Sequence, residues 1–163
     1  MTRLLLLLLL CAAGPALAYE LNGLRLGGSE RDVHRIHPSA LCKPLEWKSN
    51  AADRRCDDAR VVLDGVPGKI TVFLRADAIE AYELRFEMKE LERVKAALRA
   101  RWGAPAAEVT ETVVQRNGRE RKVFKMRWDK GAERAVLTAQ LERKRFDLEV
   151  SRGNFPEEIY RVR

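Results

Sequence analysis

The fold is predicted most directly from VFKMRW at residues 123–128, in which apolar and basic side chains alternate. Successive side chains of a β-strand point to opposite faces of the sheet, so the pattern predicts a half-buried strand. Phe124, Met126 and Trp128 then face a core, while Lys125 and Arg127 face solvent.

The flanking sequence extends this strand into a meander. Residues 109–116 and 119–128 flank Asn117-Gly118, which predicts a two-residue hairpin. A turn at 129–132 would place Met126 opposite Ala135. A second turn at Arg143-Lys144 would then place Leu137 opposite Val150, so that apolar sets match on three strands.

The first half of the chain shows weaker signals of the same kinds. Ser29, with Asp32 three residues later, predicts a capped helix that Pro38 ends. Residues 89–102 carry an apolar stripe at helical spacing, with acidic residues in the first turn and arginines in the last. Three strands are expected between the helices, at 60–64, 69–75 and 78–88.

These elements predict an α+β fold. We expect an antiparallel sheet of about seven strands with two helices on one face, in the order helix, three strands, helix, four strands. Residues 19–163 are expected to form a single domain. Division of this domain into two similar halves, at about 19–88 and 89–153, is a further interpretation of the pattern. From Gly153 onward a polar C-terminal tail is expected.

The N-terminus is typical of a secretory signal peptide. Arg3 precedes an apolar run at residues 4–13, and Ala16-Leu17-Ala18 places small residues at the cleavage positions. Cleavage after Ala18 is expected, and the run is too short to span a bilayer. A lipoprotein signal at Cys11 is the alternative, although Leu10 is larger than the small residue that such processing requires.

Cleavage would leave two cysteines, Cys42 and Cys56. In an oxidising compartment these most simply form one disulfide. A zinc site formed by His34, His37 and both cysteines is the alternative, together with free thiols; the spacing matches no common zinc pattern.

Positive charge is concentrated in the second half of the chain. The net charge is +7, and residues 113–145 hold eleven basic and four acidic residues. The alternation predicts a basic sheet face and its turns as a binding surface, formed by Arg116, Arg119, Arg121, Lys125, Arg127, Arg143, Lys144 and Arg145. A merely solvated face, with acidic neighbours on adjacent strands, is the alternative.

Motifs of catalysis are absent from the sequence: it has no G-x-S-x-G elbow, H-E-x-x-H, P-loop, dinucleotide fingerprint or C-x-x-C. His34 or His37 could serve only an unrecognised enzyme, such as a small hydrolase. We therefore expect neither catalysis nor a cofactor or metal.

Two segments resemble a known group of exported proteins. Leu26-Gly27-Gly28-Ser29 with Asp32-Val33 and His37-Pro38 resembles the helix that opens each unit of the BamE/SmpA and β-lactamase-inhibitor-protein-like (BLIP-like) fold. Trp102-Gly103-Ala104-Pro105 resembles the end of the helix in a second unit. The resemblance implies exported bacterial proteins that bind proteins or the envelope. The chain lacks the lipobox cysteine of the outer-membrane-assembly members.

Together these features predict a periplasmic or secreted, non-enzymatic binding protein of the bacterial envelope. Its expected partner is an anionic envelope component or a protein, rather than nucleic acid, because of the export signal and because no exposed aromatic residues accompany the basic strip. No transmembrane segment is expected. A periplasmic inhibitor or assembly factor is the alternative.

Overall fold

The computed structural model describes residues 19–161, so the predicted signal peptide lies outside the described residues. The chain forms a helix, four strands, a second helix, four strands and a short third helix. The first half comprises α1 (Glu30–Ile36), β1 (Leu41–Pro44), β2 (Arg54–Leu63), β3 (Val66–Arg75) and β4 (Ala78–Glu87). The second half comprises a 3₁₀ turn (Met88–Glu90), α2 (Leu91–Trp102), β5 (Ala107–Val114), β6 (Glu120–Lys130), β7 (Glu133–Gln140), β8 (Arg145–Arg152) and α3 (Phe155–Glu158).

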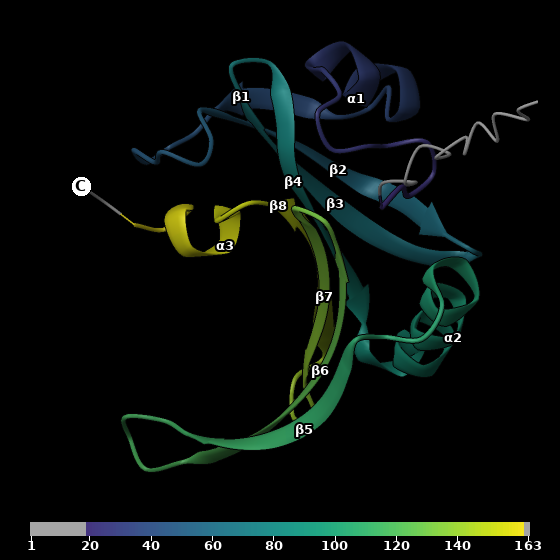
Figure 1. The fold of residues 1–163 in the computed structure, drawn as a ribbon, viewed down its shortest axis with the longest axis vertical. Coiled ribbons are helices and arrows are strands. Elements are labelled where there is room, and N and C mark those ends of the chain that lie inside the picture. The colour runs from purple at the N-terminus through teal and green to yellow at the C-terminus, as the bar shows by residue number, and fades with distance from the viewer. Residues whose placement is uncertain (1–18, 162–163) are drawn as a thin grey trace, which may run out of the picture.

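All the strands belong to one antiparallel sheet of order β1-β2-β3-β4-β8-β7-β6-β5. Each half contributes a helix followed by a four-stranded meander, and the last strands of the two meanders, β4 and β8, pair at the centre. Figure 1 shows the sheet as a strongly curved layer, with α1 and α2 on its convex side and α3 on its concave side. The β5–β6 hairpin extends from one end of this layer (Figure 1).

The architecture differs from the predicted one in its number of elements. The described residues form eight strands rather than about seven, and three helices rather than two, so the molecule is mostly sheet. The missed strand is β1, a four-residue edge strand ending at Pro44, too short to show an alternating pattern. The missed helix is α3, where a polar tail was expected; Phe155 and Ile159 are buried on its inner side.

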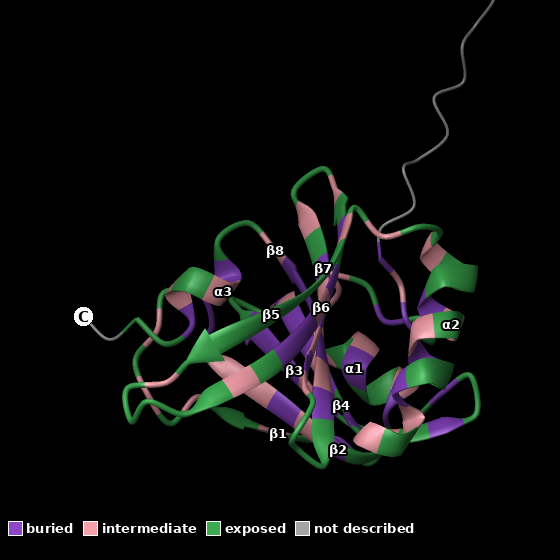
Figure 2. Ribbon diagram, turned by 90° about the horizontal axis from the view of Figure 1, so that it is seen from below, coloured by how far each residue is buried: buried purple, intermediate pink, exposed green. Residues whose placement is uncertain are grey.

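Both predicted helices pack on the same face of the sheet through apolar stripes. Leu91, Val94 and Leu98 of α2 are buried in the main core, as Figure 2 shows by the purple inner side of this helix. Ser29 caps α1 as predicted: its side chain accepts a bond from the Asp32 backbone, and the Asp32 carboxylate accepts one from the Ser29 backbone.

A second, smaller core lies on the concave side. Phe73 and Ala81 of the sheet pack against Phe155 and Ile159 of the C-terminal segment and against the β1–β2 loop. The Phe73 and Phe155 ring centroids are 5.3 Å apart. Part of the concave face is therefore covered by the chain itself.

The predicted meander of β6, β7 and β8 is present, but its register differs from the predicted one by two residues. Met126 lies opposite Leu137 rather than Ala135, and Leu137 lies opposite Leu148 rather than Val150. The β6–β7 loop is two residues long, because Lys130 still pairs with Glu133. Side chains alternate with period two, so this shift kept every apolar residue on the correct face.

The β5–β6 hairpin is shifted by one residue, which has the opposite effect. Its loop spans three residues, 116–118, with Gly118 at φ 77°, in place of the predicted two. Val109 consequently lies opposite Lys125 and Val113 opposite Arg121, on the solvent-facing side. In Figure 2 β5 is largely green, and its valines at 109, 113 and 114 are exposed.

Among residues 19–161, no helix combines the length and the apolar character that crossing a membrane requires.

Candidate functional site

The alternation along β6 separates core from solvent as predicted. Met126 and Trp128 are 0% and 2% exposed, while the side chains of Lys125 and Arg127 are 43% and 50% exposed. Arg121 is half-buried on the same face as Lys125, and its Nη1 donates to Gln140 Oε1 at 2.9 Å.

Three of the eight predicted binding residues are neutralised by nearby carboxylates. Lys125 pairs with Glu111, and Arg127 Nε lies 2.9 Å from Asp129 Oδ2. Arg145, the first residue of β8, has its Nε 3.2 Å from Glu87 Oε1. At these three positions the sheet face carries paired charge.

The other five lie toward one end of the sheet. Arg116 lies in the β5–β6 loop and Arg119 follows it, Arg121 is the second residue of β6, and Arg143 and Lys144 lie in the β7–β8 turn. That turn lies beside β6: Leu141 N donates to the carbonyl of Lys122 at 3.0 Å. Lys122 was not predicted, because its side chain falls on the opposite face from Arg121; the turn contact brings it into the cluster.

We name this cluster the basic end, formed by Arg116, Arg119, Arg121, Lys122, Arg143 and Lys144. Within residues 19–161, none of the six forms an ion pair, whereas most arginines elsewhere in the chain do. Glu142 lies beside the cluster: its Oε1 accepts from the Lys122 backbone nitrogen, and the charges of Arg121 and Lys122 help to lower its pKa. The basic end therefore presents an excess of positive charge with no direct ion pair among the described residues.

The centre of the concave face has the opposite character. Glu83 of β4 lies directly opposite Glu149 of β8, and Asp147 is two residues away. Arg85 bonds both Glu83 (2.9 Å) and Asp147 (2.6 Å). Burial, and next the charge of Asp147, raise the pKa of Glu83 to about 7; burial also raises the pKa of Glu149.

A cleft of about 360 Å³ opens beside this acidic pair. Its floor includes Asp57, which accepts bonds from Arg55 and Thr71. Its wall includes Trp47 and Tyr160, whose rings stack 5.8 Å apart. Sequence reasoning missed this cleft because it lies between the β1–β2 loop and the C-terminal segment, which was expected to be a polar tail.

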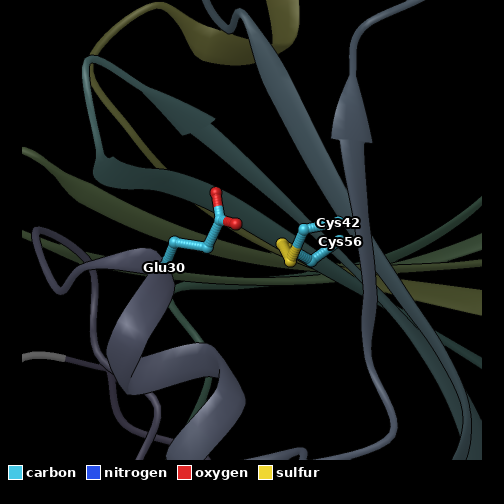
Figure 3. A group of neighbouring side chains, drawn as sticks. All are labelled: Glu30, Cys42 and Cys56. Carbon is cyan, nitrogen blue, oxygen red and sulfur yellow. A yellow bond between two sulfur atoms is a disulfide. The ribbon is translucent and has the colours of Figure 1, made fainter.

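The two cysteines within residues 19–161 form the expected disulfide rather than the alternative zinc site. Cys42 and Cys56 are register partners on β1 and β2 and are bonded to each other (Figure 3). The carboxylate of Glu30 points toward them in Figure 3, but it is held by Arg54 through two bonds of 2.8 and 3.1 Å. Both sulfur atoms and this carboxylate already have partners.

The histidine candidates for catalysis lie in different settings. His34 is exposed, with Nε2 3.8 Å from Glu30. His37 is buried, and burial lowers its pKa despite the nearby charge of Asp58. Ser39 Oγ donates to Asp58 Oδ2 at 2.7 Å. A serine nucleophile instead needs a histidine that accepts its proton, so this arrangement is a structural contact.

The chain matches no protein-family model, no curated protein and no solved structure.

Proposed function

We propose that the protein is an exported, non-enzymatic binding protein of the bacterial envelope that engages an anionic component through its basic end. The observation that carries the proposal is that the β5–β6 loop, the start of β6 and the β7–β8 turn, at one end of the sheet, carry six basic side chains that form no ion pair within residues 19–161. Crowded like charges destabilise a folded protein unless counter-charges offset them. A bound anion would supply those counter-charges.

The chemistry of the basic end favours phosphate-bearing ligands. Four of its six residues are arginines, whose planar guanidinium group can donate two parallel hydrogen bonds to one phosphate. Four of the side chains lie in or next to turns, where they can adapt to a flat or irregular surface, and Arg121 and Lys122 lie at the start of β6. Anionic lipid headgroups and phosphorylated envelope glycolipids have this chemistry in common.

Binding to phospholipid vesicles tests the proposal directly. Affinity for vesicles containing an anionic phospholipid should exceed that for neutral ones and should fall with added salt, which screens exposed charges. Arg119→Gln with Lys144→Gln should weaken binding by about 30-fold, given roughly 1 kcal/mol for each basic side chain near an anionic surface.

The matched control removes two charges elsewhere. Arg31→Gln with Lys48→Gln lowers the net charge equally but leaves the basic end intact, since both residues are exposed and lie in the first half of the chain. Equal weakening by both double variants would show that net charge alone drives binding, and the basic end would lose its role.

The cleft on the concave face supports a second candidate function, a periplasmic inhibitor or assembly factor that docks on a protein. The stacked Trp47 and Tyr160, beside fixed Arg–Asp pairs, provide the aromatic and charged groups typical of protein contacts. The resemblance to the BLIP-like group points the same way by analogy. A photo-crosslinker at Thr71 should capture one stoichiometric partner from periplasmic extract; capture of none would contradict this function.

A further inference from the structure

Tyr19, the residue that follows the expected cleavage position, is built into the core. Its side chain is 6% exposed. Its ring centroid lies 4.9 Å from that of Trp102, which in turn lies 5.6 Å from that of Trp128. Chain termini are usually frayed unless specific contacts hold them. A mature chain starting at Tyr19 would begin with such contacts.

Both backbone groups of Tyr19 have partners from distant strands. The Tyr82 hydroxyl donates to the carbonyl of Tyr19 at 2.9 Å, and the nitrogen of Tyr19 donates to Glu133 Oε2 at 3.0 Å. Tyr82 is fully buried in β4, and Glu133 begins β7. The position of this nitrogen is therefore fixed by both halves of the sheet.

The Glu133 carboxylate is an anion without a cationic side-chain partner. Among residues 19–161, no Lys, Arg or His side chain forms an ion pair with it; Arg152, opposite it in register, is instead held by Glu80 through two bonds of 2.7 Å. Asp129 and Glu20 add negative charge nearby, while Arg101 and Arg152 add positive charge. The bond from Tyr19 is the one hydrogen bond that the described chain gives this carboxylate.

We propose that cleavage between Ala18 and Tyr19 creates an α-ammonium group that pairs with Glu133 and locks the mature N-terminus into the fold. In this step a signal peptidase adds water across the peptide bond. The C–N bond breaks, Ala18 keeps the new carboxylate, and the nitrogen of Tyr19 leaves as an amine that is protonated at neutral pH. The proposal rests on the proposed export of the chain.

Cleavage changes the strength of an existing contact. Before cleavage the Glu133 carboxylate accepts a bond from a neutral amide; afterwards it faces a positive charge at the same position. The positive charge adds a Coulombic attraction between opposite charges to the existing hydrogen bond. The mature protein should therefore be more stable than the precursor, and Glu133 is the residue that provides the difference.

A thermal-denaturation cycle on purified protein tests the pairing. Two N-termini are compared: the free start has a free amine at Tyr19, and the extended start has a glycine and a serine added ahead of Tyr19. Each is prepared with Glu133 and with Glu133→Gln. In the free start the substitution should lower Tm by about 3–8 °C. In the extended start the loss should be less than half as large, because there Glu133 accepts from a neutral amide and no ion pair is lost.

Two further measurements keep the result unambiguous. Glu158→Gln, a carboxylate of α3 on the other side of the sheet that pairs with Arg161 at 3.0 Å, should change both starts equally. Acetylating only the α-amino group in synthesis, with Glu133 intact, should lower Tm as the extension does. Equal losses from Glu133→Gln in both starts would overturn the pairing, as would an acetylated start as stable as the free one.

The cleavage position is read from the intact mass of the exported protein. A chain beginning at Tyr19 supports the assignment, and any other start overturns it. None of these experiments uses a ligand, so their outcome is independent of anion binding at the basic end.

Discussion

Single residues on the concave face carry charge that the fold compensates only in part. Glu83 and Glu149 lie opposite each other on the two central strands, where like charges destabilise the pairing. Arg85 offsets part of this repulsion, but it is shared with Asp147. The sequence shows that each carboxylate faces away from the helices; it does not show that they face each other.

The raised pKa of Glu83 predicts a stability that falls as pH rises. The folded state, with a pKa of about 7, holds a proton that the unfolded state releases near the ordinary value of 4.5. This contribution is complete below about pH 4.5 and is lost as pH rises through 7. Tm should therefore decline between pH 5 and pH 8, and Glu83→Gln should flatten the decline.

Calorimetry across this pH range checks the prediction. Glu149 is expected to leave a residual slope, because burial raises its pKa too. Glu120→Gln, an exposed carboxylate in no ion pair within residues 19–161, serves as the control and should keep the parent slope. A Glu83→Gln variant with an unchanged slope would contradict the assignment.

Among the elements, strand β1 depends on a covalent bond more than on packing. Its four residues include an exposed Leu41 and a terminal proline, and it forms the edge of the sheet. The disulfide from Cys42 joins it to Cys56 at the position where the two strands are in register. The cysteine count predicted the bridge, but only the pairing shows that the bridge holds a strand.

Reduction of the disulfide should loosen this edge selectively. The bridge closes a loop with a sequence separation of 14, for which the chain-entropy estimate gives about 3 kcal/mol of stability. With dithiothreitol, amide exchange in residues 41–43 should accelerate most, while β4 and β8 stay protected. A variant with Cys42→Ala and Cys56→Ala should not respond to the reductant. Uniform acceleration across the sheet would show that β1 has no special dependence.

Elements with strong local signals were predicted well, and those set by loop geometry were not. Helix α2 was recognised from its apolar stripe and the arginines in its last turn. The β5–β6 loop, one residue longer than predicted, turned Val109 and Val113 to solvent. Loop length sets register, and an odd shift reverses a strand where an even shift does not.

At the scale of the whole molecule, two meanders share one core. The main cluster of buried residues includes Val33 of α1 and Leu98 of α2, together with residues from both halves of the sheet. β4 and β8 pair over seven residue positions at the junction. The halves therefore depend on each other for burial, although their element order repeats.

We expect the molecule to unfold in one cooperative transition. Separating the halves would expose the central strands and the shared core at once, so neither half is stabilised alone. Calorimetric and van't Hoff enthalpies should agree, and fluorescence and circular dichroism should give the same midpoint. Two resolved transitions would show that the halves fold independently.

Charge is segregated along the molecule in a way that only the assembled sheet reveals. The excess of basic residues at 113–145 was visible in the sequence, as was their outward orientation on β6. The structure separates side chains that form ion pairs, such as Lys125, Arg127 and Arg145, from those of the basic end, which form none within residues 19–161. Ion pairing depends on neighbours from other strands, which composition does not specify.

Four features could be predicted from the sequence alone: helix α2, the cap of α1, the pairing of the two cysteines, and the alternation on β6 that separates core from solvent. Each of these depends on residues within a few positions of one another, or on chemistry that leaves a single partner. Only the tertiary structure decided the registers, the cleft beside Glu83 and the contact of Tyr19 with Glu133. Those features join segments up to 114 residues apart, and loop geometry and sheet order bring such segments together.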